Sequence, residues 1–305
     1  MRILRNILYV LTPGAYLALD GENVVLQKEG EELRRVPLHN LEGIVAFGYT
    51  GASPALMGAC ASRGVALSFL TMHGRFLARV VGEEQGNVVL RKTQYRVSDD
   101  PAASLAYARN MLIGKVYNSR QVVERALRDY ALRLDGEKLR RISGFLAESL
   151  NRLKDTAGLE ELRGVEGEAA ARYFAAADDL ILQQKEAFTF QGRSRRPPLD
   201  NCNALLSFVY TLLSHDTAAA LSSVGLDPYV GFLHRDRPGR RSLALDLMEE
   251  MRPVLADRFV LTMINNRQIG PEGFTKRENG AVMMEEDTRR MILTAWQKRK
   301  QDIIT

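Results

Sequence analysis

The character of the chain changes at SDDPAASLAYARNMLIGKVYNSRQVVERALRDYALRL, residues 98–134. Asp99 or Asp100 is a suitable N-cap here, and Pro101 suits the first turn of the helix that follows. Apolar residues then recur at helical spacing between positions 105 and 127. The stretch therefore predicts a long helix that opens a helical region.

The residues before this stretch are predicted to be mostly β-structure. Short apolar runs alternate with turn-forming sequences, as in ILYV (7–10), NVVLQ (23–27) and GIVAF (43–47). One helix interrupts these runs: Ser53 can cap it, Pro54 suits its first position and Gly64 suits its left-handed end.

After residue 134 we find helical patterns only, with loops expected at 135–138, 157–165, 191–201 and 225–241. The segment 203–225 is almost wholly apolar or small, so it predicts a buried central helix in which His215 is packed. We therefore predict an α+β fold. A β-rich, sandwich-like N-terminal domain covers residues 1–95, and an all-α C-terminal domain covers residues 96–305.

The composition limits the classes of function. The chain has 305 residues, of which 46% are hydrophobic and 26% charged, so it can bury a core. Its formal net charge of +5 is compatible with binding to nucleic acid or to anionic membranes. Cys60 and Cys202 fit no metal-binding spacing and favour a reducing cytoplasm, while His39 and His73 are interpreted as surface or structural residues. We expect no signal peptide and no membrane span.

A histidine, several arginines and several carboxylates occur together in GFLHRDRPGRRSLALDLMEEMRP, residues 231–253. His234 precedes an arginine-rich loop and an acidic helix. Asp246 and Glu249 are three residues apart and share one helix face, and Glu250 is four residues from Asp246. Hard divalent cations take carboxylate oxygens, and one imidazole shifts the preference toward Mn²⁺. The alternative interpretation is a loop that runs into a solvated amphipathic helix.

Another carboxylate stands in an unusual setting. Glu166 lies between Gly164 and Gly167 in RGVEGEAAARYF, residues 163–174, which we place at the start of a helix. The positive end of a helix stabilises a carboxylate, which is a purely structural explanation of Glu166. The glycines favour instead a cramped active-site turn with unusual dihedral angles.

A second basic segment, FQGRSRRPPLDNCNALLSFVY, covers residues 190–210. Arg193, Arg195 and Arg196 crowd a stretch that precedes two prolines. Basic residues in a loop are usually only solvated, but beside a phosphate channel they would bind DNA. Asn201 and Asn203 are suitable caps for the following helix.

Three motifs together resemble the CRISPR-associated integrase of spacer acquisition, the Cas-one family. They are GVEGEAA (164–170), PLDNCNALLSFVY (198–210) and GLDPYVGFLHRDRPGRRSLALDLMEEMRP (225–253). Their order, spacing and residue types match the family, and the match extends over most of residues 1–300. The second motif is most similar to the subtype I-C branch. The resemblance implies the same β-rich N-terminal domain and all-helical C-terminal domain.

The resemblance also implies a single divalent metal site that holds Mn²⁺ or Mg²⁺. Glu166 and His234 match the family's glutamate and histidine ligands, and Glu249 is taken as the third ligand. Asp246 matches a second acidic position that supports the site, so these four residues form the expected catalytic set. Spacing alone does not divide the roles among Asp246, Glu249 and Glu250. The expected DNA-binding residues are Arg193, Arg195, Arg196, Arg235, Arg237, Arg240 and Arg241.

The family's reaction joins the 3′-hydroxyl of a short DNA fragment to a phosphodiester of a CRISPR repeat by transesterification, and its nuclease reaction uses the same site. The resemblance implies a cytoplasmic homodimer that contacts itself through the β-rich domain. It further implies double-stranded DNA and a dimer of the second adaptation protein, Cas-two, as partners. One alternative is a metal-dependent nuclease or junction-resolving enzyme without an integration role. Another is a non-catalytic DNA-binding subunit, in which replacing the three ligands leaves activity unchanged.

Overall fold

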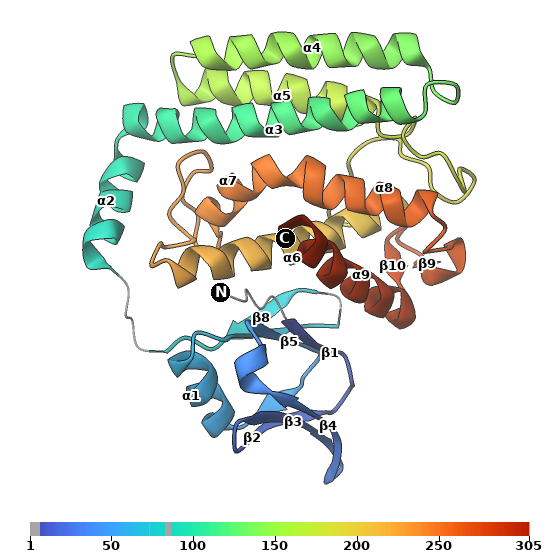
Figure 1. Ribbon diagram of the computed structural model, residues 1–305. Coiled ribbons are helices and arrows are strands. Elements are labelled where there is room, and N and C mark those ends of the chain that lie inside the picture. Colours follow the sequence, from blue (N-terminus) through green and yellow to red (C-terminus); the bar gives the residue numbers. More distant parts are fainter. Residues whose placement is uncertain (1–6, 73, 83–86, 305) are drawn as a thin grey trace. The chain divides into compact units, whose positions relative to one another are not determined.

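The computed structural model describes residues 7–72, 74–82 and 87–304, so the interpretation of His73 lies outside the described residues (Figure 1). The chain divides into two compact units. One contains residues up to 85 together with 289–305, and the other contains residues 86–288. Strands dominate the first unit and helices the second, so the predicted α+β class is confirmed.

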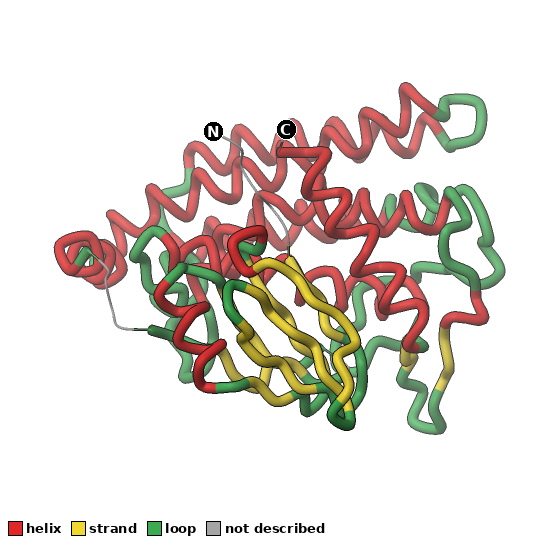
Figure 2. Tube along the Cα trace, turned by 60° about the horizontal axis from the view of Figure 1, so that its bottom comes forward, coloured by secondary structure: helices red, strands yellow, loops and turns green. Residues whose placement is uncertain are grey.

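The first unit contains two four-stranded sheets (Figure 2). The first sheet has the order β1 (Ile7–Val10), β5 (Gly43–Phe47), β7 (Ala66–Leu70) and β8 (Phe76–Arg79). Its strands β1, β5 and β7 are parallel, and β8 is antiparallel to β7. The second sheet has the order β4 (Glu31–Pro37), β3 (Asn23–Lys28), β2 (Tyr16–Asp20) and β6 (Gly51–Ala52).

The two sheets share one buried cluster, as a sandwich-like domain requires. Leu17 and Val24 of the second sheet pack in it with Ile44 and Leu67 of the first sheet. The helix α1 (Pro54–Ser62) adds Leu56 to the cluster. The predicted signals of α1 are confirmed, because the Ser53 hydroxyl accepts a hydrogen bond from an amide of its first turn and Gly64 has a φ of +69°.

The long helix α3 (Pro101–Asp129) organises the second unit. It packs against α4 (Gly136–Asp155), α5 (Leu159–Ala175) and α7 (Ser242–Met251), and Figure 1 shows α4 and α5 lying along it. Leu112 of α3, Leu146 of α4 and Val165 of α5 belong to one buried cluster. Further helical elements of this unit are α2 (Val88–Asp99), α6 (Asn201–Ser223), a π-helical turn η2 (Arg252–Asp257) and α8 (Arg258–Asn265). The helix α9 (Glu286–Ile304) starts in this unit, but residues from 289 onward belong to the first unit.

Several boundaries differ from the predicted ones. Helical structure starts at Val88, ahead of the boundary placed after residue 95, and residues 289–305 fall with the strand-rich unit. The prediction of helices only is wrong, because β9 (Phe274–Lys276) and β10 (Val282–Met284) form an antiparallel hairpin. Strands of three residues are too short to show an alternating pattern. The predicted loop at 157–165 is also wrong, because α5 begins at Leu159.

The helix α6 is buried, as its apolar composition predicts. By length and composition alone it would be able to cross a membrane, and it is the single such helix among the described residues. However, 56% of its most apolar window is buried inside the protein. Leu205, Val209 and Leu213 are nearly inaccessible, which is the pattern of a core helix.

The N-cap of α3 is Asp100, whose carboxylate accepts a hydrogen bond of 2.9 Å from the Ala102 amide. We therefore expect Asp100→Ala to lower the free energy of unfolding by about 1 kcal/mol. The neighbouring Asp99 is the matched control, because Asp99→Ala should change the free energy by less than about 0.5 kcal/mol. Urea unfolding followed by circular dichroism measures both, and equal losses would contradict this assignment of the cap.

Candidate functional site

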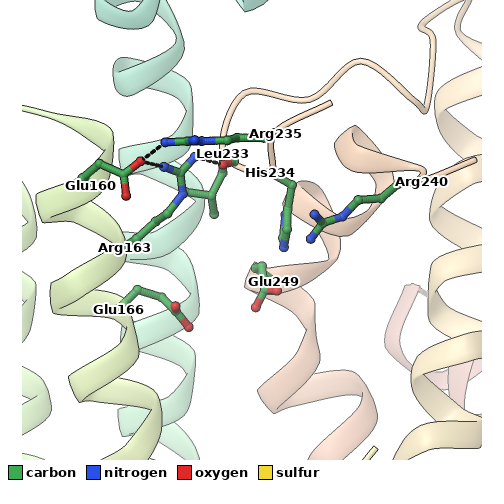
Figure 3. Close-up of a pocket in the computed structure, with 8 residues that line it drawn as sticks. All are labelled: Glu160, Arg163, Glu166, Leu233, His234, Arg235, Arg240 and Glu249. Carbon is green, nitrogen blue, oxygen red and sulfur yellow. Dashed lines mark hydrogen bonds and ion pairs between the residues drawn. The ribbon is translucent and has the colours of Figure 1, made fainter. Parts of the chain in front are cut away.

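The candidate site is a cavity of about 510 Å³ in the helical unit (Figure 3). Glu166 on α5, Glu249 on α7 and His234 on the loop before α7 all line it. The wall is completed by four further polar or charged residues and one leucine: Glu160, Arg163, Arg235, Arg240 and Leu233. The fold therefore brings the three predicted ligands to one cavity, although they come from three separate segments.

Glu166 reaches the cavity from the middle of a helix, which corrects the predicted placement. Since α5 starts at Leu159, Glu166 is not in its first turn, where Glu160 and Glu161 lie instead. Gly164 and Gly167 do not form a cramped turn, because a Cβ added to either would meet no atom within 4 Å. Neither glycine has a positive φ.

Asp246 is fully buried and holds the loop that carries His234. One carboxylate oxygen accepts hydrogen bonds from the Phe232 and Leu233 amides, at 2.7 and 2.8 Å. The other accepts from the His234 amide at 3.0 Å and lies 2.5 Å from His234 Nδ1. A neutral His234 therefore keeps its proton on Nδ1, so Nε2 is the atom available as a ligand. Figure 3 shows the imidazole extending into the cavity toward Glu249.

The same packing requires glycine at position 231. A Cβ on Gly231 would lie 2.7 Å from a carboxylate oxygen of Asp246 and 2.9 Å from the Ser242 backbone carbon. The backbone of this loop therefore approaches α7 too closely for any side chain. This contact fixes how the loop enters the site.

Glu249 is ionised within a set of charges. Arg252 approaches one of its oxygens at 2.6 Å, and the Lys115 ammonium approaches the other at 2.6 Å. Lys115 also forms an ion pair with Glu166. Burial raises the pKa of the Glu249 carboxyl, but the charges of Lys115 and Arg252 outweigh burial and leave the pKa below its usual value.

These contacts divide the roles of the three acidic residues on α7. Asp246 orients His234, Glu249 faces the cavity, and Glu250 is exposed. Glu250 lies against α3, where a Cβ on Gly114 would come within 2.7 Å of its side chain. Lys115 was missed by sequence reasoning, because a single lysine on a long helix carries no signal. Arg252 carried a weak sequence signal, since a basic residue three positions after Glu249 can pair with it on one helix face.

The three predicted ligands, which are two carboxylates and one imidazole, suit a hard divalent cation. Within residues 7–72, 74–82 and 87–304, however, no three His, Cys, Asp or Glu side chains are gathered closely enough to hold an ion. Glu166 and Glu249 are instead both paired with the Lys115 ammonium. The chemistry of these residues and their shared cavity fit a divalent metal. The charge between the two carboxylates is supplied here by the Lys115 ammonium.

The arginines of the loop before α7 lie in different surroundings. Arg235 is exposed and pairs with Glu160, Arg237 is exposed, and Arg240 is half-buried in the cavity wall. Arg241 instead turns to α6, where its guanidinium lies 3.2 Å from His215 Nδ1. Burial, helped by the Arg241 charge, lowers the pKa of His215 to about 4. His215 is therefore a neutral, partly buried residue, in agreement with the prediction that it packs.

The second basic segment also separates into two kinds of arginine. Arg195 and Arg196 are exposed. Arg193 turns inward: it donates to the Asn203 side-chain oxygen at 2.7 Å and lies over the Tyr210 ring. Burial lowers the pKa of Arg193. Its guanidinium is thus engaged by the protein, contrary to the expectation of a DNA contact.

The predicted caps of α6 need a similar correction. Asp200 is the N-cap, because its carboxylate accepts from the Asn203 amide at 2.7 Å. The side chain of the fully buried Asn203 instead donates to the Gly192 carbonyl at 2.8 Å. Asn203 therefore holds the basic segment to α6.

Comparison with known proteins gives consistent matches along the chain. The family described as CRISPR associated protein Cas1 matches residues 8–298. "CRISPR-associated endonuclease Cas1 1" of Chlorobaculum tepidum is 50% identical over 299 residues, which cover 98% of this chain and 87% of the relative. "CRISPR-associated endonuclease Cas1 2" of Rhodospirillum rubrum is 48% identical over 305 residues, which cover 99% and 88%.

Solved structures have the same fold. A CAS1 protein from Thermotoga maritima has a TM-score of 0.82 at 22% identity, with 97% of this chain and 90% of that chain covered. A casposase bound to integration product has a TM-score of 0.80 at 25% identity, with 96% and 82% covered. A chain of a Cas6-RT-Cas1–Cas2 complex has a TM-score of 0.81 at 24% identity, with 98% and 32% covered.

The hydrogen bonds of Asp246 lead to a stability prediction. In Asp246→Asn an amide nitrogen would replace an oxygen and face backbone N–H donors. We expect the free energy of unfolding to fall by about 2 kcal/mol, because buried donors lose their acceptor. The matched control is Glu250→Gln, an exposed residue on the same helix, with an expected change below about 0.5 kcal/mol. Urea unfolding measures both variants, and an unchanged stability in Asp246→Asn would contradict the role assigned to this carboxylate.

Proposed function

Because the chain belongs to the CRISPR-associated Cas1 family, we propose that it joins the 3′-hydroxyl of short DNA fragments to a phosphodiester of a CRISPR repeat. The reaction is a transesterification, and phosphodiester hydrolysis is its counterpart with water. The observation that carries the proposal is the single cavity that Glu166, His234 and Glu249 line together with Arg235 and Arg240. The likeness to a casposase that was solved with an integration product supports integration as well as cleavage.

We propose that Glu166, Glu249 and Nε2 of His234 hold Mn²⁺ or Mg²⁺. A bound divalent cation would stabilise charge on the attacked phosphate and activate the attacking oxygen. Asp246 holds the Nδ1 proton of His234 and so keeps Nε2 free to bind. Arg252 stays paired with Glu249 and keeps this buried carboxylate ionised.

The arginines of the cavity would position the DNA. Arg240 lies in the wall beside His234, and Arg235 is exposed at the same cavity. Guanidinium groups bind phosphate oxygens bidentately, which fixes the strand relative to the reacting phosphate. Arg163 supports this wall from α5 by donating to the Leu233 carbonyl and pairing with Glu160. Arg237, Arg195 and Arg196 are exposed and would extend the phosphate contacts away from the cavity.

The proposal includes the partners of the family. The substrates are double-stranded DNA fragments and the CRISPR repeat, and the protein works in the cytoplasm, where that DNA lies. It forms a homodimer through its strand-rich unit and assembles with a Cas2 dimer, in line with the solved complex that contains Cas1 and Cas2. Assignment to subtype I-C rests on the motif at 198–210.

A second candidate is a metal-dependent nuclease or junction-resolving enzyme that does not integrate DNA. This candidate is favoured by the names of the chain's relatives, which are called endonucleases. The two candidates differ in the nucleophile, since a DNA 3′-hydroxyl and water compete at one site. Products joined to the repeat identify the integrase, while cleaved products alone identify the nuclease.

We expect Mn²⁺ to support strand transfer of a short duplex into a repeat, and EDTA to abolish it. Glu249→Gln should lower the rate by at least about 100-fold without unfolding the protein, because a ligand oxygen and its charge are lost. Glu250→Gln is the matched control and should keep the rate. Gel analysis of joined products with and without Cas2 gives the rates, and circular dichroism reports folding. Full activity in Glu249→Gln would remove this residue from the ligand set.

The exposed arginines lead to a separate prediction on affinity. Replacing Arg195 and Arg196 by glutamine should weaken duplex binding and reduce the salt slope of the affinity by about 2, or about one per lost phosphate contact. Arg193→Gln should instead lower the free energy of unfolding, because Arg193 supports Asn203. Fluorescence anisotropy at several salt concentrations measures the slope. An unchanged salt slope in the double variant would contradict the role of Arg195 and Arg196 in DNA binding. A stable Arg193→Gln variant with an equal reduction of the salt slope would contradict the structural role of Arg193.

A further inference from the structure

Lys115 pairs with two carboxylates that line the cavity, although no motif includes this lysine. Its ammonium pairs with Glu166 on α5 and lies 2.6 Å from Glu249 on α7. The side chain is 13% exposed, and that of Glu249 is 6% exposed. Two carboxylates held together without a cation would repel each other, so the ammonium between them offsets part of this repulsion.

The packing of α3 fixes this placement. Gly114, next to Lys115, lets α3 approach α7, since a Cβ there would come within 2.7 Å of the Glu250 side chain. One turn further along, the Asn118 amide group donates to the Glu250 carbonyl at 2.8 Å. Lys115 therefore lies where α3 packs closely against α7. This packing places its side chain within reach of Glu249.

We propose that the Lys115 ammonium takes the place of the divalent cation between Glu166 and Glu249 in the metal-free protein, and leaves it when the metal binds. This inference rests on the proposed metal site. Like charges cannot share the position between two carboxylates, so metal binding includes the work of displacing Lys115. Lys115 thereby holds Glu166 and Glu249 together before the metal binds, and it lowers the metal affinity of the site.

The arrangement of Glu249 makes the idea testable without destroying the site. Arg252 pairs with the Glu249 oxygen that Lys115 does not contact, so Glu249 keeps a charged partner when Lys115 is replaced. A neutral side chain at position 115 therefore removes the competing charge and leaves the proposed ligands in place. Lys115→Met preserves the length of the side chain, and Lys115→Gln preserves the ability to donate a hydrogen bond.

The experiment measures Mn²⁺ binding to the full chain, stripped of metal, by isothermal titration calorimetry and by electron paramagnetic resonance of free Mn²⁺. We expect Lys115→Met and Lys115→Gln each to lower the Kd by on the order of tenfold. The matched control is Lys138→Met, because Lys138 forms an ion pair of 2.5 Å with Asp179 on the same unit. Its Kd should equal that of the unchanged protein. Folded neutral variants at position 115 that bind Mn²⁺ no more tightly than the unchanged protein would overturn the inference.

A measurement on the unchanged protein covers the case in which neither variant folds. An amine-specific reagent and mass spectrometry report the labelling rate of each lysine. Addition of Mn²⁺ should increase the labelling of Lys115 and leave that of Lys138 constant, and a constant rate at Lys115 would overturn the inference.

His234→Ala separates this inference from the metal proposal. If His234→Ala binds Mn²⁺ as well as the unchanged protein does, the proposed metal site and the role of Lys115 both fail. If His234→Ala weakens binding but a neutral residue 115 does not tighten it, only the role of Lys115 fails.

Discussion

The buried carboxylate of Asp246 is the constraint on which the site depends. A buried charge is tolerated only when its oxygens are satisfied, and here three successive amides and one imidazole provide the hydrogen bonds. These bonds attach the loop 232–234 to α7 and turn Nε2 of His234 toward the cavity. The Arg163 guanidinium adds a further contact by donating to the Leu233 carbonyl. The chemistry of the imidazole is thus set by a residue that does not itself face the cavity.

Glu249 is connected through Arg252 and Tyr210 to the buried carboxylate of Asp257. Asp257, in the π-helical turn, accepts hydrogen bonds from Tyr173 at 3.0 Å and from Tyr210 at 2.6 Å. Burial raises the pKa of Asp257 to about 6. Arg193 and Arg252 both lie over the Tyr210 ring, with guanidinium-to-centroid distances of 5.2 and 5.0 Å. Through Tyr210, the inward arginine of the basic segment and the arginine that pairs with Glu249 are part of one arrangement. The Arg193 guanidinium is thus held by contacts inside the protein.

Much of the fold was readable from local patterns. Pro101, Asp100 and the spacing of apolar residues predict α3, and the apolar composition of 203–225 predicts a buried α6. The hairpin of β9 and β10 was missed, since its strands have three residues each. The start of α5 was misplaced because Gly158, Gly164 and Gly167 suggest a loop, whereas the latter two glycines lie inside a regular helix. Tertiary packing of α5 on α3 and α4 outweighs the low helix propensity of glycine.

The sequence by itself determined the family, the candidate ligands Glu166, His234 and Glu249, and the split into strand-rich and helical parts, because these depend on motifs and on local periodicity. Only the tertiary structure decided that Asp246 orients the histidine, that Glu250 points away, and that Arg193 and Arg241 turn inward. It alone showed Lys115 between two carboxylates. The physical reason is that charges act through distance in space, and residues far apart in the chain meet only where α3, α5 and α7 pack.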